Sequence, residues 1–322
     1  MIKVSGDLVG KTKILFMGTP DFAVPSLAAL IRSGRDVAGV VTQPDRPKGR
    51  GRQAARPPVK VLAQSHGIAV YQPEKVRDAA FLEVFRGIAP ELVVVAAFGQ
   101  ILPKEILVCP KYGCINVHPS LLPRCRGAAP IQWTLIRGET ETGVTIMQMD
   151  EGVDSGGILL QEETPIGPEE DFGALHDRLS LMGAELLIGA VEAVESGKAV
   201  CTPQDPALAT FAPRLKKEDG RIRWERSCRE ILNLIRGLSP VPGAYTCLNG
   251  KVLKIFSAAI SECRHEKVPG TAGPLAEEGL AVAAGDGHVL LRDVQLENKN
   301  RMPIGDFLRG CRLGPDARVG DA

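Results

Sequence analysis

The sequence predicts an α/β protein in which a mostly parallel sheet covered by helices is followed by a smaller antiparallel β domain. Three observations carry this prediction. Short apolar runs alternate with stretches of helical periodicity through the first part of the chain, and Glu91–Ala97 is an apolar run of strand length. Near the C-terminus, one helix precedes several strand-like runs with hairpin turn signals between them. Runs of the first kind form parallel sheets, and runs of the second kind form antiparallel sheets.

Length and composition set the limits within which this fold must work. The 322 residues suffice for two domains, and 44% hydrophobic and 24% charged residues with a net charge of +1 are typical of a soluble protein. No apolar run is long enough to span a membrane, and the first residues lack a secretion signal, so we expect a cytoplasmic protein. Eight cysteines form no Cys-x-x-Cys pair and no zinc spacing, which predicts free thiols and no metal.

The chain begins with a strand–helix–strand unit. Lys13–Gly18 is predicted as a buried strand, Phe22–Arg32 as a helix and Asp36–Thr42 as the next strand. This order implies parallel strands joined by a right-handed crossover, the Rossmann-like arrangement. The first turn lacks the Gly-x-Gly-x-x-Gly fingerprint, so we expect neither a nicotinamide nor a flavin cofactor.

A basic loop, Gln43–Lys60, interrupts the pattern. It holds six basic residues and one acid, and its glycines and prolines predict an irregular segment. A solvated crossover is one interpretation. The other is an arm that binds a nucleic-acid backbone, and the length of the loop favours this second interpretation. The basic residues available for such contacts are Arg46, Lys48, Arg50 and Arg52.

The central strands place loops where α/β sheets bind ligands. Helices are predicted at Val59–Ser65 and Asp78–Arg86, with a short strand at Ile68–Val70 between them. The loop Phe98–Pro103 follows the apolar strand Glu91–Ala97. Loops at the carboxyl ends of parallel strands form the usual binding edge of such sheets.

The stretch Gly113–Pro130 carries the first candidate catalytic residues. It begins as a strand, and Asn116 and His118 share one face because side chains two apart on a strand point the same way. Pro119 and Pro123 then stop regular pairing. Taken alone, the pair favours the simpler interpretation of a buried strand that carries two satisfied polar residues.

The remainder of the first domain contains an acidic turn. Gly143–Met149 alternates like a strand and leads into Asp150–Gly157, after which Ile158–Glu162 is predicted as another strand. Asp171–Ser196 has the pattern of a long amphipathic helix that closes this domain. A helix at Ala128–Arg137 precedes the turn region.

Domain boundaries follow from the change of pattern. We expect an N-terminal extension over 1–12, a catalytic domain over 13–198, a linker over 199–217 and a C-terminal domain over 218–322. In the last region, a helix at Ser227–Arg236 precedes strand-like runs separated by turn signals, and an oligonucleotide-binding (OB-like) β-barrel is a candidate. The predicted strands are Ala244–Leu248, Lys251–Ala258, Leu280–Ala284 and His288–Val294.

Three separated motifs, in this order, resemble the folate-dependent formyltransferases. They are Asn116-Val117-His118, Ser120-Leu121-Leu122-Pro123, and the turn Asp150-Glu151-Gly152-Val153-Asp154-Ser155-Gly156. The resemblance extends over nearly the whole chain, and Cys125 departs from it because an aromatic residue is expected there. It implies a formyltransferase core, 10-formyltetrahydrofolate as donor co-substrate, and catalytic roles for Asn116, His118 and Asp154. It also implies folate contacts from Ser120, Leu121, Leu122, Pro123 and Arg124.

Within this family, the resemblance is narrowest to members that formylate initiator methionyl-tRNA for translation initiation. It implies that the basic loop and the C-terminal domain bind the tRNA. No protein partner is implied, and we expect a monomer. Other members of the family act on a sugar-nucleotide amine or hydrolyse formylfolate, and these would not need the loop. A tRNA-binding homologue without activity is a third alternative, against which the intact Asn116, His118 and Asp154 argue.

The chemistry suits these side chains. Formyl transfer to an amine passes through a tetrahedral intermediate, whose oxyanion needs pre-oriented N–H donors such as the Asn116 amide and the His118 imidazole. Asp154 supplies a charge partner for His118, and the two can shuttle the proton that the amine loses and the folate nitrogen gains. No covalent intermediate is required, so none of the cysteines needs to be a nucleophile.

Overall fold

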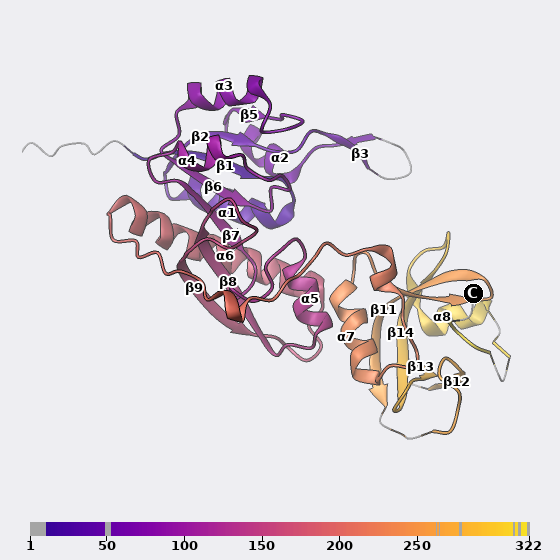
Figure 1. Cartoon of the computed structure of the whole chain (residues 1–322). Coiled ribbons are helices and arrows are strands. Elements are labelled where there is room, and N and C mark those ends of the chain that lie inside the picture. The colour runs from indigo at the N-terminus through magenta and orange to yellow at the C-terminus, as the bar shows by residue number, and fades with distance from the viewer. Residues whose placement is uncertain are drawn as a thin grey trace, which may run out of the picture. The chain divides into compact units, whose positions relative to one another are not determined.

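A computed structural model describes residues 11–48, 53–261, 263, 265–276, 279–311, 313–314 and 317–320. The chain forms two compact units, each made of three separate stretches. The colour in Figure 1 follows the chain from the N-terminus to the C-terminus. The first unit is drawn from three stretches of chain: Met1–Arg126, Gly143–Glu163 and Asp177–Thr210. The second unit takes the stretches between them and the C-terminal part: Gly127–Thr142, Thr164–His176 and Phe211–Ala322.

The main sheet has seven strands in the order β5-β2-β1-β6-β7-β8-β9. β5, β2, β1, β6 and β7 run parallel to one another, and β8 is antiparallel to β7. The mostly parallel α/β fold predicted from the sequence is therefore confirmed. The strands are β1 (Lys13–Gly18), β2 (Asp36–Val41), β5 (Val70–Tyr71), β6 (Leu92–Ala96), β7 (Cys114–His118), β8 (Glu141–Gln148) and β9 (Ile158–Pro165).

Helices bury the central strands. The helices that accompany this sheet are α1 (Val24–Arg32), α2 (Pro58–Ser65), α3 (Ala79–Ile88), α4 (Lys104–Val108) and α6 (Phe172–Glu195). Residues Ile14–Met17 of β1 are fully buried, which accounts for the apolar run that predicted this strand. On α3, Phe81 and Phe85 join the same buried cluster as Met17. Each such side chain contributes about 1.5–3 kcal/mol through burial, so the sheet has a well-defined core.

Helix α6 fixes the position of β7. A Cβ added at Gly183 would lie 2.7 Å from Cγ1 of Val117 and 3.3 Å from Cγ1 of Val144, so the helix backbone approaches β7 and β8 closely. Only glycine permits this approach without a shift of the strand. Val117 faces α6, so its neighbours Asn116 and His118 point to the opposite side of the sheet.

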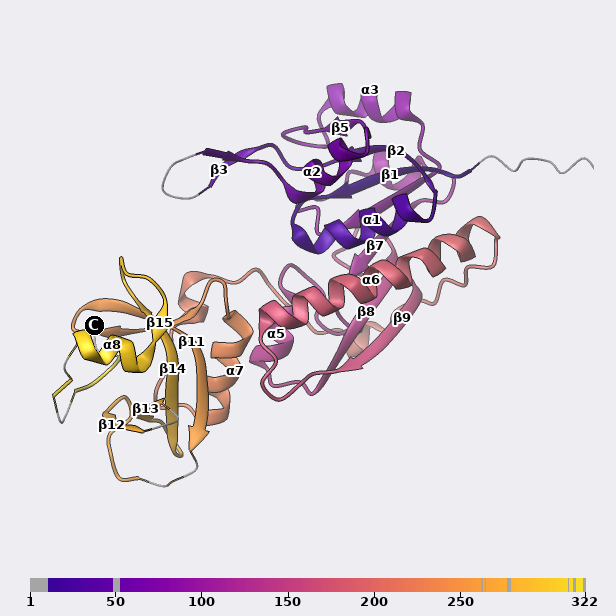
Figure 2. The ribbon, with the colours of Figure 1, turned by 180° about the vertical axis from the view of Figure 1, so that it is seen from behind.

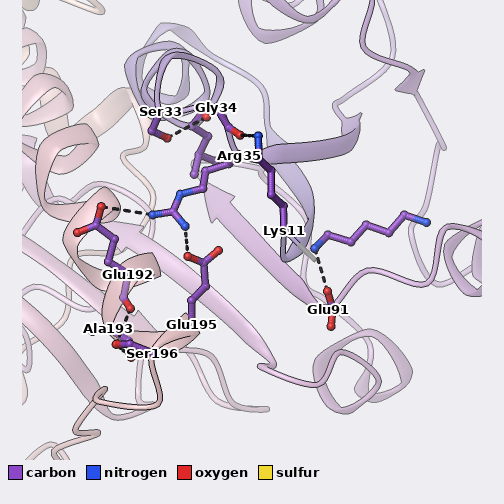
Figure 3. A network of polar contacts seen from close by, with 11 residues as sticks. Lys11, Ser33, Gly34, Arg35, Glu91, Glu192, Ala193, Glu195 and Ser196 are labelled. Atoms are coloured by element: carbon purple, nitrogen blue, oxygen red, sulfur yellow. Dashed lines mark hydrogen bonds and ion pairs between the residues drawn. The ribbon is translucent and has the colours of Figure 1, made fainter. Parts of the chain in front are cut away.

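A polar network ties the end of α6 to the start of β2. The guanidinium of Arg35 donates to Glu195 and, at 3.3 Å, to Glu192, both in the last turn of α6 (Figure 3). Nearby, the Lys11 ammonium donates to the carbonyl of Gly34, and the backbone N–H of Lys13 donates to Glu91. These contacts lie where β1 and β2 begin, away from the carboxyl edge of the sheet, so they are structural.

The basic loop is more regular than the sequence predicted. Its flanks form an antiparallel pair, β3 (Arg46–Lys48) with β4 (Gln53–Ala55), in which Pro47 lies opposite Ala54. The expectation of an irregular segment was wrong here, because proline is tolerated on an edge strand and both strands of a two-stranded ribbon are edges. Arg46 is exposed on β3.

Half-buried polar contacts anchor the base of this ribbon. Lys60 on α2 donates to both carboxylate oxygens of Asp45 at 2.8 Å and to Oε1 of Gln72 at 2.7 Å. Gln72 in turn donates to Asp45 and to the carbonyl of Gln43. The Lys60 and Gln72 hydrogen bonds lower the pKa of the Asp45 carboxyl. The ribbon therefore leaves the sheet from a fixed point.

The second unit is built on a curled antiparallel sheet, seen from behind in Figure 2. Its strands run in the order β10-β11-β14-β13-β12, with β15 paired to β14. The unit also contains the helices α5 (Pro130–Ile136), α7 (Cys228–Leu238) and α8 (Ile304–Gly310). The strands are β10 (Ala244–Leu248), β11 (Lys251–Ser261), β12 (Ala272–Ala276), β13 (Gly279–Ala283), β14 (His288–Leu296) and β15 (Met302–Pro303).

The C-terminal segment joins the two edges of this sheet. Beside β12, the N–H of Ala272 donates to the carbonyl of Ala317, and the N–H of Val319 donates to Gly270. On the other edge, the N–H of Gly320 donates to Cys247 of β10. The sheet is thereby nearly closed into a barrel, as the OB-like class predicted from the sequence requires.

Helix α7 begins with a capping box. The Ser227 hydroxyl accepts from the N–H of Glu230, and the Glu230 carboxylate accepts from the N–H of Ser227. Asp286, from the turn after β13, accepts from the N–H of Cys228 at 2.7 Å. These acceptors satisfy the N–H groups of Ser227, Cys228 and Glu230 at the start of the helix. In the described part of the chain, no helix has the length and apolarity needed to cross a membrane.

Candidate active site

Strand β7 carries Asn116 and His118 to the carboxyl edge of the parallel strands. It lies between β6 and β8, with Asn116 opposite Val95 and Met147. Both side chains are buried, with Asn116 9% and His118 4% exposed. Among the residues that the structure describes, none hydrogen-bonds to the Asn116 amide, so its N–H groups are available to a ligand. The sequence correctly placed the two residues on one strand face.

The two ring nitrogens of His118 face different partners. Nε2 lies 3.1 Å from the carbonyl oxygen of Cys125 and donates to it. Nδ1 then faces the carboxylate of Asp154, whose Oδ2 is 3.7 Å away. A ring held at Nε2 by a carbonyl has its other nitrogen directed at a carboxylate, which is the arrangement that orients an imidazole for proton transfer. His118 ends β7 and Asp154 lies in the turn between β8 and β9, so the fold brings together two residues that are 36 positions apart in the sequence.

The acidic turn that carries Asp154 is braced from within. Asp150 accepts from the N–H of Gly152 at 3.0 Å and from the Ser155 hydroxyl at 2.9 Å. A Cβ added at Gly156 would lie 1.9 Å from the carbonyl oxygen of Gln148, so this position requires glycine. Asp154 itself has φ of 49°, in the left-handed region that non-glycine residues seldom adopt. Asp150 therefore shapes the turn, and Asp154 is the residue presented to His118.

The loop after His118 is fixed by hydrogen bonds to its own backbone. The Ser120 hydroxyl donates to the carbonyl of Arg124 at 2.7 Å. On β8, the Thr145 hydroxyl donates to the Ser120 carbonyl at 2.7 Å and accepts from the Leu122 N–H at 3.2 Å. Gln161 of β9 donates to the Leu122 carbonyl at 3.0 Å. The loop is thus rigid before any ligand arrives.

A cavity of about 630 Å³ opens beside this loop. Of the five residues predicted as folate contacts, Leu121, Leu122, Pro123 and Arg124 line it, whereas Ser120 is buried within the loop and bonds to Arg124. The remaining lining residues come from β9 and from a later segment: Gln161, Glu163 and Leu208. The volume is in the range of small-molecule sites.

Cys125 has an unusual backbone conformation. Its φ is 59°, it is buried, and its carbonyl is the acceptor for His118. Thr210 holds this conformation in place: its hydroxyl accepts from the Cys125 N–H at 2.9 Å, and its backbone bonds to Pro123 and Arg126. The position thus acts through its carbonyl, which any residue supplies, and this explains why a cysteine is tolerated where an aromatic residue was expected.

Sequence reasoning missed two residues near the site. Gln204 and Thr210 lie in a stretch with little periodicity, yet both bond to the loops that carry the candidate catalytic residues. Arg126, a buried cation next to Cys125, bonds to Gln204. No local sequence signal marks Gln204 or Thr210, because their partners are distant in the chain.

Two of the four predicted tRNA contacts lie on strand β3 of the basic ribbon. Arg46 is on β3 and exposed, and Lys48 ends the same strand. Arg50 and Arg52 lie outside the described residues. No contact within the described ranges joins Arg46 to His118 or Asp154, so the structure does not itself connect the ribbon to the catalytic residues. Within the same ranges, no group of three or more His, Cys, Asp or Glu side chains has the arrangement to hold a metal ion.

An amide, an imidazole and a carboxylate at the carboxyl edge of a parallel sheet define an α/β enzyme site. Comparison with known protein families identifies the class of enzyme. Residues 12–191 match the family model described as "Formyl transferase", and residues 214–312 match "Formyl transferase, C-terminal domain". The chain belongs to the formyl transferase family. The resemblance inferred from the three motifs is thereby confirmed.

Close relatives narrow the comparison. A protein of Syntrophus aciditrophicus (strain SB) named methionyl-tRNA formyltransferase is 61% identical over 312 residues, which are 97% of this chain and 100% of the relative. Among solved structures, HypX from Aquifex aeolicus in complex with tetrahydrofolic acid has a TM-score of 0.65 at 19% identity, covering 93% of this chain and 47% of HypX. Methionyl-tRNA formyltransferase from Clostridium thermocellum has a TM-score of 0.54 at 18% identity, and the match covers 79% of this chain and 95% of that chain. These two structures support the fold alone.

Proposed function

We propose that this protein transfers the formyl group of 10-formyltetrahydrofolate to the free amino group of initiator methionyl-tRNA. One observation carries the proposal: 61% identity over the full length of a relative named methionyl-tRNA formyltransferase. The arrangement of Asn116, His118 and Asp154 at the sheet edge supports it, because these groups match the requirements of formyl transfer to an amine.

In this proposal, the amine nitrogen attacks the formyl carbon and a tetrahedral intermediate forms. The Asn116 amide, which has no protein partner in the described chain, donates an N–H to the developing oxyanion. The bond from the formyl carbon to the folate nitrogen then breaks. The amine loses one proton and the folate nitrogen gains one, and His118 with Asp154 carries this proton.

We propose different roles for the three side chains. Because Nε2 of His118 is engaged by the Cys125 carbonyl, the ring meets the reaction through Nδ1, on the side of Asp154. We therefore assign the oxyanion chiefly to Asn116 and proton transfer to the His118–Asp154 pair. Leu121–Arg124, beside the 630 Å³ cavity, are proposed as the wall against which the folate binds.

The acceptor would be held by other parts of the sequence. We propose that the basic loop Gln43–Lys60, through Arg46, Lys48, Arg50 and Arg52, and the C-terminal region over 218–322 bind the tRNA backbone. The enzyme would act as a cytoplasmic monomer. Phosphate contacts of this kind position a nucleic acid without reading its sequence.

The direct test is incubation with 10-formyltetrahydrofolate and initiator methionyl-tRNA, followed by detection of formylmethionine released from the tRNA. Two further reactions serve as controls: one without acceptor, which detects hydrolysis of the donor, and one with an amino-sugar nucleotide as acceptor. Formylmethionine on the tRNA is expected. Donor consumption without formylated tRNA, or transfer to the sugar alone, would overturn the proposal.

A further inference from the structure

We propose that Gln204 is a positioning residue that holds the turn of Asp154 in its working conformation by linking it to the buried Arg126. This inference rests on the proposed function, since it assigns Gln204 a role in the reaction through Asp154. Gln204 lies 50 residues beyond Asp154 in the chain. Its side-chain amide joins the turn of Asp154 to Arg126, which lies in the loop after His118.

The contacts of Gln204 use its full hydrogen-bonding capacity. Oε1 accepts from Nε of Arg126 at 3.0 Å and from Nη2 at 2.7 Å. Nε2 donates to the carbonyl of Asp154 at 2.9 Å and to that of Gly156 at 2.7 Å. A guanidinium only donates and a carbonyl only accepts, so the amide can have only this orientation. A primary amide is the side-chain group that satisfies both partners.

The Asp154 turn has a specific need for this support. Asp154 adopts a positive φ of 49°, which costs free energy and persists only where surrounding contacts hold it. The internal bonds of Asp150 reach Gly152 and Ser155. Gln204 instead holds the carbonyls of Asp154 and Gly156, on both sides of Ser155. Its amide therefore acts at the residue whose carboxylate faces His118 at 3.7 Å.

Arg126 strengthens the contact. Arg126 is a buried residue, 8% exposed as a whole, and in the described chain its guanidinium donates to Gln204 rather than to a carboxylate. A cation that pulls on Oε1 polarises the amide and makes its N–H groups better donors. The chain just before Gln204 is anchored to the start of β9, since Thr202 and Ile158 exchange two backbone hydrogen bonds of 2.8 Å.

The test compares kinetics of Gln204→Glu with the wild type. The carboxylate keeps an acceptor for Arg126, so the variant is expected to fold, but it loses both N–H donors to the turn. We expect kcat for formyl transfer to fall about tenfold, with KM for donor and tRNA unchanged within twofold. Gln64→Glu, the same chemical change at an exposed position of α2, is the matched control and should leave kcat unchanged.

A double-mutant cycle separates positioning from a general structural role. In an Asp154→Asn background, measured by single turnover with radiolabelled donor, Gln204→Glu should cause less than a twofold further loss, because the carboxylate it positions is gone. An undiminished tenfold loss there would overturn the inference, as would a loss confined to KM or a kcat within twofold of wild type. If Gln204→Glu does not fold, Gln204→Met is tested against the same limits.

The outcomes distinguish the two proposals. A wild-type enzyme that makes no formylmethionyl-tRNA refutes the proposed function, and this inference falls with it. A wild-type enzyme that is active, with a Gln204→Glu variant that is equally active, refutes only the positioning role.

Discussion

The carbonyl oxygen of Cys125 lies 3.1 Å from Nε2 of His118, so a backbone group seven residues later in the chain sets the orientation of the imidazole. The peptide that supplies this carbonyl is held at φ of 59° by Thr210. One nitrogen of the imidazole is thus held by the main chain, while the other faces the Asp154 carboxylate. This explains how the loop tolerates a cysteine at this position.

Replacing His118 or Asp154 should slow the chemical step strongly without weakening the binding of the substrate. For His118→Ala and Asp154→Ala we expect kcat to fall by about 10²–10⁴, the range for a positioned acid or base. The Kd for methionyl-tRNA, measured by filter binding, should stay within about threefold of wild type. His66→Ala, at an exposed position, is the control. Retained turnover with weakened tRNA binding would contradict the assignment.

The Asn116 amide is assigned to the oxyanion. Asn116→Ala should lower kcat about 10²–10³-fold, since one such donor contributes roughly 3–4 kcal/mol to the transition state. KM for the donor should change little, because the interaction forms as the oxyanion develops. Steady-state kinetics and circular dichroism together check this. A loss carried by KM alone would instead make Asn116 a binding residue.

Arg46 on the basic ribbon is proposed to contact a tRNA phosphate. Arg46→Ala should raise KM for tRNA and reduce the slope of log K against log salt by about one unit. The kcat at saturating tRNA should be unchanged. Arg86→Ala, an exposed arginine on α3, serves as the comparison. An unaltered salt slope would show that the ribbon is a solvated connection.

Two buried thiols predict a pH dependence of stability. Burial raises the pKa of Cys114 and of Cys228 to about 12, with Asp286 adding to the effect at Cys228. Both values exceed the unfolded value of about 8.5, so the folded chain holds more protons than the unfolded chain between them. The resulting stability is present below about pH 8.5 and is lost as the pH rises toward about 12.

Urea unfolding at a series of alkaline pH values tests this prediction. The midpoint should fall as the pH rises from about 9. The combined variant Cys114→Ala and Cys228→Ala should show a shallower decline. At pH 8, iodoacetamide should modify exposed Cys109, Cys201 and Cys263 well before either buried thiol. Rapid labelling of Cys114 or Cys228 would be inconsistent with their burial.

Much of the fold could be predicted because its signals are local. β7 was placed correctly, since an apolar run with two polar residues on one face has a short period and a clear end at Pro119. The expected helix Ser227–Arg236 corresponds to α7, Cys228–Leu238, because its capping box lies within four residues. The strands β12 and β15 escaped notice, since each is short and β12 contains glycine and proline.

The candidate site was predictable only where a motif marks it. Asn116 and His118 stand in a motif on β7 and Asp154 in a motif in the turn after β8, and the fold brings His118 and Asp154 together. Thr210 and Gln204 could not be predicted, since their partners lie 85 and 50 residues away. A side chain that bonds to backbone carbonyls leaves no pattern in a single sequence. Such contacts depend on tertiary structure alone.

Residues 202–210 hydrogen-bond to the turn of Asp154 and to the loop after His118, and these bonds limit how far the chain can be shortened. A recombinant fragment that stops near residue 198 would keep Asn116, His118 and Asp154 but would lack Gln204 and Thr210. Its truncated end would leave the Arg126 guanidinium buried without its acceptor and the Cys125 N–H without the Thr210 hydroxyl. A fragment meant for crystallography or ligand screening should therefore extend at least through Thr210.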